Sequence, residues 1–123
     1  MEEKEKIRSF TDLIAWKKAH SLVLMIYKIT DEFPKSEIFG LTNQIRRSAV
    51  SITSNIAEGF SRATNKDKSQ FYAMSLGSLT ELQSQLLIAR DVEYISKENF
   101  MAISALSIEV SKLLNGLRKI RNT

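Results

Sequence analysis

The stretch QIRRSAVSITSNIAEGFSR, residues 44–62, has the spacing of one amphipathic helix that carries two parallel lines of side chains. Side chains three and four positions apart lie on the same face of a helix. One line is apolar, whereas the other is polar where a helix bundle normally carries Leu or Ile. The apolar line is Leu41, Ile45, Ala49, Ile52, Ile56 and Phe60, and the polar line is Gln44, Arg47, Ser51, Asn55, Glu58 and Arg62.

The rest of the chain continues this helical spacing on both sides of the stretch. The pattern predicts helices over residues 12–32, over 37–62, from 66 to a break at 93–96, and from 97 onward, because no segment alternates for long as a strand does. Ser9 or Thr11, Ser36 and Ser96 are the expected caps, and Pro34 ends the first helix. Short connections make neighbouring helices antiparallel. We therefore predict an all-α fold, an antiparallel up-down-up-down four-helix bundle.

The third and fourth helices each contribute a line of apolar residues to the expected core. These residues are Phe71, Met74, Leu79, Leu82, Leu86 and Ala89 in the third helix, and Ile103, Leu106, Val110, Leu113, Leu117 and Ile120 in the fourth.

The composition is that of an ordinary soluble protein of 123 residues. We expect residues 1–10 to be a solvated lead-in and residues 11–123 to form a single domain. The absence of cysteine excludes disulfides and thiolate metal sites, and a single histidine, His20, excludes a multi-histidine metal site. No cofactor is expected. The first residues lack the pattern of a signal peptide, and no apolar run is long enough to cross a membrane, so we expect a cytoplasmic protein without a membrane partner.

The formal net charge is +4, and the predicted topology gathers many of the Lys and Arg residues at one end of the bundle. One end of the predicted bundle gathers both termini and the connection between the second and third helices, close to Lys17 and Lys18. These cations could contact phosphate groups, but Lys and Arg in a last helical turn also stabilise the helix dipole by about 0.3–1 kcal/mol. Both explanations stay open. The proposed nucleic-acid-binding residues at this end are Arg62, Lys66, Lys68, Arg118, Lys119 and Arg121.

The polar line of residues 44–62 has a counterpart in the third helix, where Ser75, Ser78, Glu81 and Gln85 recur at the same spacing. We predict a partly buried network in which Arg47 pairs with Glu81 and Asn55 bridges backbone or hydroxyl groups between helices. The network would join the second and third helices or two subunits. The alternative is a solvent-exposed polar face.

Two other features carry a prediction each. Gly77 lies inside the third helix, where glycine costs about 1 kcal/mol relative to alanine, so it predicts the close approach of another helix unless it is a tolerated imperfection.

Glu58 and Glu81 could act as an acid and a base. Structural carboxylates explain them more simply, and His20 suits packing, so the sequence favours a protein that is not an enzyme.

Five segments together resemble the family of proteins encoded in intervening sequences of 23S ribosomal RNA. They are FTDLIAWKKA (10–19), FPKSE (33–37), GLTNQIRR (40–47), SITSNIAEGFSR (51–62) and GSLTEL (77–82). The resemblance covers nearly the whole chain, and NIAEG at 55–59 together with Trp16 is its most specific part. Ser48 and Thr53 stand where the family often carries alanine and proline.

The resemblance implies an up-down bundle that assembles as a ring-shaped homopentamer. It also implies kinship with the accessory protein of diversity-generating retroelements, a basic nucleic-acid-binding partner of a reverse transcriptase. We therefore expect a non-enzymatic, homo-oligomeric RNA-binding or ribonucleoprotein accessory protein that binds through its basic end. The alternative is a protein-binding scaffold, for example for a reverse transcriptase, without a direct role at nucleic acid.

Overall fold

The computed structural model describes residues 6–121, and side chains as far as Lys119. Its α-helices are α1 (Ile14–Thr30), α2 (Leu41–Ser61), α3 (Asn65–Asp91) and α4 (Lys97–Arg121), and two short 3-10 helices, η1 (Phe10–Asp12) and η2 (Lys35–Glu37), precede α1 and α2. The described residues contain no strand. The prediction of an all-α, four-helix fold is confirmed.

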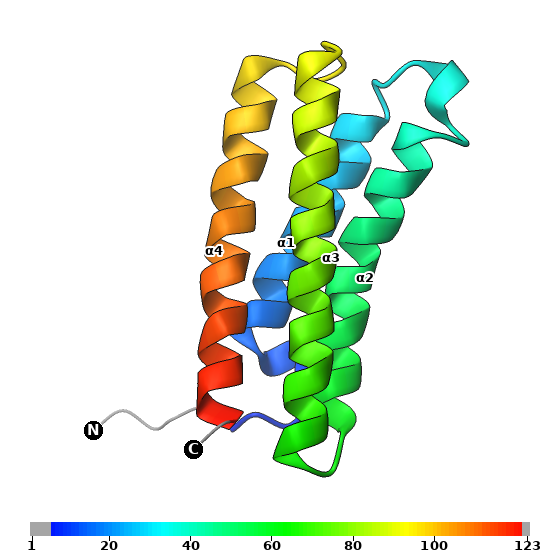
Figure 1. Ribbon diagram of the computed structural model, residues 1–123. Coiled ribbons are helices and arrows are strands. Elements are labelled where there is room, and N and C mark those ends of the chain that lie inside the picture. The colour runs from blue at the N-terminus through cyan, green and yellow to red at the C-terminus, as the bar shows by residue number, and fades with distance from the viewer. Residues whose placement is uncertain (1–5, 122–123) are drawn as a thin grey trace.

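The four helices lie side by side, and each packs against two others (Figure 1). α1 contacts α2 and α4, and α3 contacts the same two helices. The chain turns back at each connection, so that the α2–α3 connection lies at the same end as the beginning of α1 and the end of α4 (Figure 1). We call this the terminal end. The opposite end, with η2 and the α3–α4 connection, is the far end.

Polar side chains cap the beginnings of η1, α3 and α4. Ser9 Oγ accepts from the Thr11 amide over 3.3 Å and caps η1, whereas α1 begins at Ile14 after Leu13 without a side-chain cap, so the cap predicted for the first helix belongs to η1 instead. Thr64 Oγ1 accepts from the Asp67 amide over 3.2 Å at the start of α3. The predicted cap Ser96 accepts from the Asn99 amide over 3.1 Å at the start of α4.

The start of the second helix was predicted too early. Lys35–Glu37 forms η2, and α2 begins at Leu41. The reason is that the Glu37 carboxylate accepts from the Leu41 amide over 3.1 Å and from the Tyr94 hydroxyl over 2.9 Å. Glu37, rather than Ser36, thus joins η2 to the beginning of α2 and to the α3–α4 connection.

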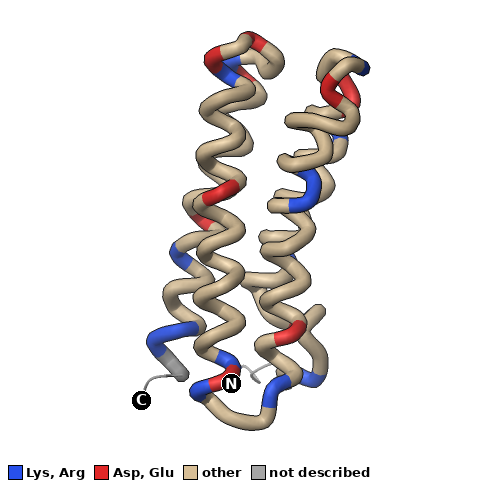
Figure 2. Tube along the Cα trace, turned by 45° about the vertical axis from the view of Figure 1, so that its right-hand side comes forward, with Lys and Arg blue, Asp and Glu red and all other residues tan. Residues whose placement is uncertain are grey.

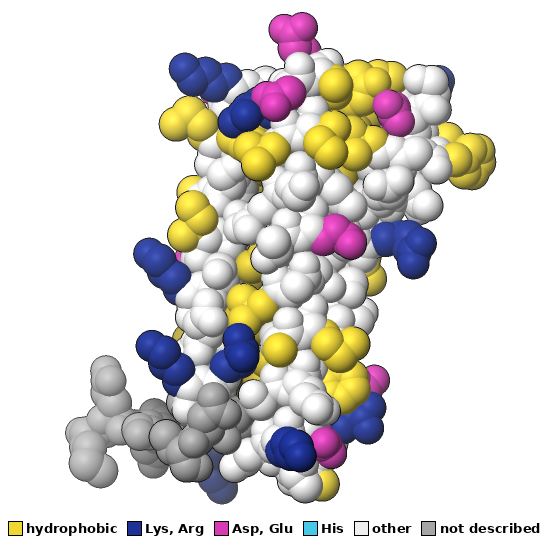
Figure 3. All heavy atoms as spheres, viewed as in Figure 1, with side chains coloured by type: hydrophobic (Ala, Val, Ile, Leu, Met, Phe, Trp, Pro, Cys, Tyr) yellow, Lys and Arg dark blue, Asp and Glu magenta, His cyan; other side chains and the backbone are white. Residues whose placement is uncertain are grey.

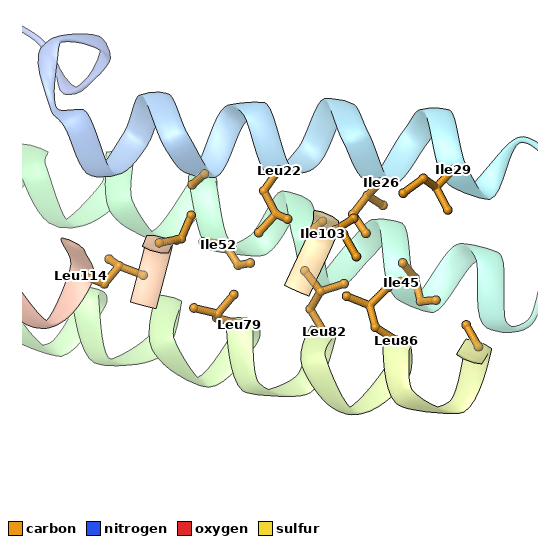
Figure 4. Packing of buried hydrophobic residues seen from close by; sticks show 14 of the residues in the cluster. Leu22, Ile26, Ile29, Ile45, Ile52, Leu79, Leu82, Leu86, Ile103 and Leu114 are labelled. Atoms are coloured by element: carbon orange, nitrogen blue, oxygen red, sulfur yellow. The ribbon is translucent and has the colours of Figure 1, made fainter. Parts of the chain in front are cut away.

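The core runs along the axis of the bundle, where the four helices meet (Figure 4). Burying one such aliphatic side chain stabilises the fold by about 1.5–3 kcal/mol. Its largest fully buried apolar residues are Leu22, Ile26, Ile45, Ile52, Ile56, Leu79, Leu82, Ile103, Val110 and Leu114.

Some predicted core positions turn out to flank the core. Leu106, Leu113 and Leu117 of α4 are only half-buried, because Ser107 and Leu114 take the central positions. Met74 of α3 is exposed, since Ser75 points inward instead. The side chain of Ile120 lies outside the described residues.

Within the described chain, one segment, Lys97–Lys119, is long and apolar enough to cross a membrane by composition. Its inward stripe packs against α1 and α3, and 22% of the apolar window is buried inside the bundle. The segment also keeps Met101 and Ile108 exposed.

Candidate functional site

Short side chains of α2 and α3 form hydrogen bonds across the contact between the two helices. Ser51 Oγ lies 2.8 Å from Ser78 Oγ across the contact. Asn55 does not bridge the two helices as predicted, because its Nδ2 donates within α2, to the Ser51 carbonyl oxygen over 2.9 Å and to Ser51 Oγ over 3.1 Å. The buried Ser75 hydroxyl donates to the Ile52 carbonyl oxygen over 2.8 Å. The structure therefore brings the middle of the predicted polar line together with α3 of the same subunit.

The predicted pair between Arg47 and Glu81 is not formed. Glu81 Oε1 accepts instead from the Ser48 hydroxyl, and Arg47 makes no hydrogen bond or ion pair within the described residues. Ser48 is buried and points directly at α3, whereas Arg47 is exposed and points farther outward. Ser48 was not predicted as part of the network, although it lies four residues after Gln44 and three before Ser51.

Beside these hydrogen bonds, the surface between α2 and α3 has an open polar hollow of about 430 Å³. The Oε1 atom of Gln85 is buried there and has no hydrogen-bond partner among the described residues. An unpaired buried acceptor of this kind costs about 1–3 kcal/mol, which a donor from outside the subunit would recover. The lining residues are Gln44, Arg47, Ser48, Ser51, Ser78, Glu81 and Gln85.

The structure separates the two glutamates that were considered as an acid and a base. Glu81 is bonded to Ser48, which precedes Glu58 by ten residues, or about 15 Å along α2. Glu58 instead forms an ion pair with Arg62 over 3.0 Å. In the described part of the chain, no group of three or more His, Asp or Glu side chains could hold a metal ion.

His20 is exposed rather than packed inside the bundle. Its ring stacks on Trp16 with the ring centres 4.7 Å apart, and Trp16 in turn meets Phe10 of η1 edge to face at 5.3 Å. Phe10 thus belongs to the packed structure, although it was placed in the lead-in, whose residues 1–5 lie outside the described part.

Lys and Arg positions lie on several segments at the terminal end, with some Asp and Glu positions among them, and the far end also carries both kinds (Figure 2). Two of the predicted cations at the terminal end already have partners within the chain. Arg62 pairs with Glu58, and its guanidinium lies 4.4 Å from the centre of the Phe71 ring. Lys68 Nζ donates to the Phe60 carbonyl oxygen over 2.5 Å, at the end of α2.

The other predicted cations differ in how accessible they are. Lys66 and Lys119 are exposed, whereas Arg118 is half-buried and its Nε atom has no hydrogen-bond partner among the residues described. The side chain of Arg121 lies outside the described residues. Lys112, seven residues before Lys119, is also exposed, and the sequence analysis missed it although this spacing places it on the same helix face.

Hydrogen bonds shift the pKa of one side chain at each end of the bundle. The backbone N–H groups of Arg8 and Ser9 lower the pKa of Asp12 below its usual 3.8. At the far end, the hydrogen bond to the Glu37 carboxylate raises the pKa of the Tyr94 hydroxyl above its usual 10.0. Both shifts favour the protonation state that forms these hydrogen bonds, which is the ionised carboxylate for Asp12 and the neutral hydroxyl for Tyr94.

The glycine prediction was wrong within the subunit. A Cβ atom added at Gly77 would meet nothing within 4 Å among the described residues, so the subunit itself does not require glycine there. The close approach occurs instead at Gly59, in the last turn of α2. A Cβ atom there would lie 2.8 Å from Cε1 of Tyr72 and 3.0 Å from Cβ of Phe71.

Comparisons with known proteins agree with this geometry. A family model described as 23S rRNA-intervening sequence protein matches residues 11–116. A solved structure from Bacteroides thetaiotaomicron VPI-5482, described as a protein with unknown function from the S23 ribosomal protein family, superposes with a TM-score of 0.77 at 27% sequence identity. The match covers 86% of this chain and 99% of that chain. Among curated proteins, no match is found.

Proposed function

Because the chain belongs to the 23S rRNA-intervening sequence protein family, we propose that it is a non-enzymatic, cytoplasmic RNA-binding protein that acts as a homo-oligomer. The terminal end is the proposed binding surface, and the observation that carries the proposal is the gathering of cations from different segments there (Figure 2). Lys66 and Lys119 are the exposed members of this group that have no partner within the described residues, and Lys112 extends it along α4.

A single subunit offers few uncommitted charges, so the proposal includes the assembly. We take the oligomer to be a ring-shaped homopentamer of single-domain, up-down-up-down bundles, as the family resemblance implies. Cyclic symmetry points every terminal end the same way, so that the exposed lysines of all subunits face one RNA. Each phosphate that they neutralise releases counterions, and the affinity then falls as the salt concentration rises.

The proposal is tested by removing the uncommitted charges. The double variant Lys66→Ala/Lys119→Ala should bind a structured RNA more weakly than the wild type and show a shallower dependence of log Kd on log salt, measured by fluorescence anisotropy. The matched control is Lys35→Ala/Lys97→Ala, which removes two exposed lysines of the far end. Equal losses in the two variants, or binding that salt does not weaken, would contradict the proposal.

A second candidate function is a scaffold that binds another protein, such as a polymerase. It is supported by the polar hollow, where Gln85 Oε1 is buried without a donor and Arg47 has no partner within the described residues. The two functions separate in one experiment, since Arg47→Ala should weaken a scaffold's contact with its partner, whereas Lys66→Ala/Lys119→Ala should leave that contact intact.

A further inference from the structure

Phe39 is a large apolar side chain held in solvent. It is 91% exposed, and its neighbour Ile38 is also exposed. The segment that carries Phe39 is fixed on both sides, because Glu37 accepts hydrogen bonds from Tyr94 and from the Leu41 amide. Phe39 and Ile38 together form an exposed apolar patch, and such patches, unlike single apolar side chains, mark contacts with other molecules.

A groove between α3 and α4 has the complementary character. It encloses about 200 Å³, which is less than the roughly 300–1,000 Å³ of pockets for small molecules and suits one large side chain. Leu87 and Ile108 remain exposed at its sides. We call this the α3–α4 groove, and it is lined mainly by Leu86, Leu87, Phe100, Ser104, Ser107 and Ile108.

Phe39 and the α3–α4 groove both lie toward the far end of the bundle but on different sides of it. Phe39 precedes α2 at the far end, and the groove is formed by the last turns of α3 and the first turns of α4, which meet at that end (Figure 1). Hydrophobic side chains are visible over both regions in the space-filling view (Figure 3). The two surfaces therefore cannot meet within one subunit, but they can meet between two.

We infer that Phe39 of one copy inserts into the α3–α4 groove of the next copy. Rotation about an axis parallel to the helices changes the position of a residue around the ring but not its height, so it can bring Phe39 to a neighbour's groove. A contact between two different faces is heterologous, and it closes into a ring when the rotation closes. The inference rests on the homo-oligomer of the proposed function and assigns the residues of its interface.

A second copy suits the groove better than a charged ligand does. Residues 38–45 contain no charged side chain, and neither does the lining of the groove. Insertion of the Phe39 ring would cover the exposed flanks of Leu87 and Ile108 without placing a charge in the groove. Replacing Phe39 by aspartate would place a charge in this groove.

Thiol crosslinking tests the contact directly, because the chain has no cysteine of its own. Full-length Phe39→Cys and Ser104→Cys variants are mixed under conditions that allow subunit exchange and are treated with a short bismaleimide. We expect covalent dimers that contain one chain of each variant, and we expect the Phe39→Cys/Ser104→Cys double variant to form a ladder of covalent oligomers. Neither single variant alone should crosslink. Crosslinking of Phe39→Cys to itself would instead indicate a two-fold contact and would overturn the inference.

Light scattering across a dilution series separates this inference from the proposed function. Phe39→Asp should raise the protein concentration needed for assembly by about 30-fold, the effect of losing a central contact residue. The control Leu24→Asp changes an equally apolar, 59% exposed residue of α1 and should assemble like the wild type. Wild-type oligomers without the crosslink would overturn only the Phe39 contact. The RNA affinity of Lys66→Ala/Lys119→Ala tests only the proposed function and does not bear on the Phe39 contact.

Discussion

The replacement of Gly59 by alanine tests how closely α2 and α3 approach each other. A Cβ atom at this position would lie 2.8 Å from Cε1 and 3.1 Å from Cδ1 of Tyr72, and 3.0 Å from Cβ of Phe71. Tyr72 is buried, and Cβ of Phe71 is bonded directly to the backbone of α3. The methyl group therefore cannot be accommodated by turning one flexible side chain, and the end of α2 must move away from α3.

Two effects of opposite sign decide the stability of Gly59→Ala. Overpacking a well-filled contact costs about 1–3 kcal/mol. Alanine is also the better helix former, which returns up to about 1 kcal/mol. We therefore expect the variant to be less stable than the wild type by about 1 kcal/mol, with a range of about 0–2 kcal/mol from these two terms.

Gly77→Ala is the matched control, because it makes the same chemical change inside a helix where the added atom meets no described residue within 4 Å. We expect this variant to be about 1 kcal/mol more stable than the wild type. The helix-propensity effect largely cancels between the two variants, so their difference of about 1–3 kcal/mol isolates the overpacking cost. Urea unfolding followed by far-UV circular dichroism measures it, at one protein concentration because assembly also stabilises the fold. If Gly59→Ala gains as much stability as Gly77→Ala, the reasoning about the close approach is refuted.

Three further substitutions test single hydrogen bonds by the same unfolding assay. Ser75→Ala removes a buried bond to a backbone carbonyl of α2 and should cost about 0.5–1.5 kcal/mol, whereas Ser84→Ala on the exposed face of α3 should be nearly neutral. Because the pKa of Tyr94 is raised on folding, its hydrogen bond should make the free energy of unfolding of the wild type larger than that of Tyr94→Phe. This difference should be complete below pH 10.0 and disappear as pH rises through the folded-state pKa. A difference that does not change with pH would contradict this. Because the pKa of Asp12 is lowered on folding, the free energy of unfolding of the wild type should exceed that of Asp12→Asn fully above pH 3.8. This difference should be lost as pH falls through the folded-state pKa. A difference that stays constant down to acid pH would count against it.

The helices and most of the core follow from the sequence because each helix repeats its apolar residues with one period. The beginning of α2 does not follow from that period, since it depends on the hydrogen bond from Tyr94 to Glu37, two residues that lie far apart in the sequence. The same limit explains Ser107, which lies at the centre of the core although its type suggested a flank. Its hydroxyl donates to the Ser104 carbonyl oxygen over 2.8 Å and accepts from Gln83 over 3.2 Å, so it is buried with its hydrogen bonds formed.

The candidate site shows what spacing alone can and cannot predict. Spacing placed Ser51, Ser78 and Glu81 at one contact between helices, and the structure brings them together there. It could not tell Arg47 from Ser48, because one helix step rotates a side chain by about 100° and decides whether it meets α3 or lies outside the contact. It also could not tell which glycine faces a neighbouring helix, since that depends on the aromatic residues opposite.

The polar line of α2 is better explained by close packing than by chemistry. Serine and glycine let two backbones approach, but a hydroxyl between helices is stable only when it is hydrogen-bonded. The hydroxyls of Ser51 in α2 and Ser75 in α3 meet this condition within the subunit. Arg47 of α2 and the Oε1 atom of Gln85 in α3 do not meet it within the described residues. Substitutions of these two residues should therefore affect assembly or partner binding more than the stability of one subunit.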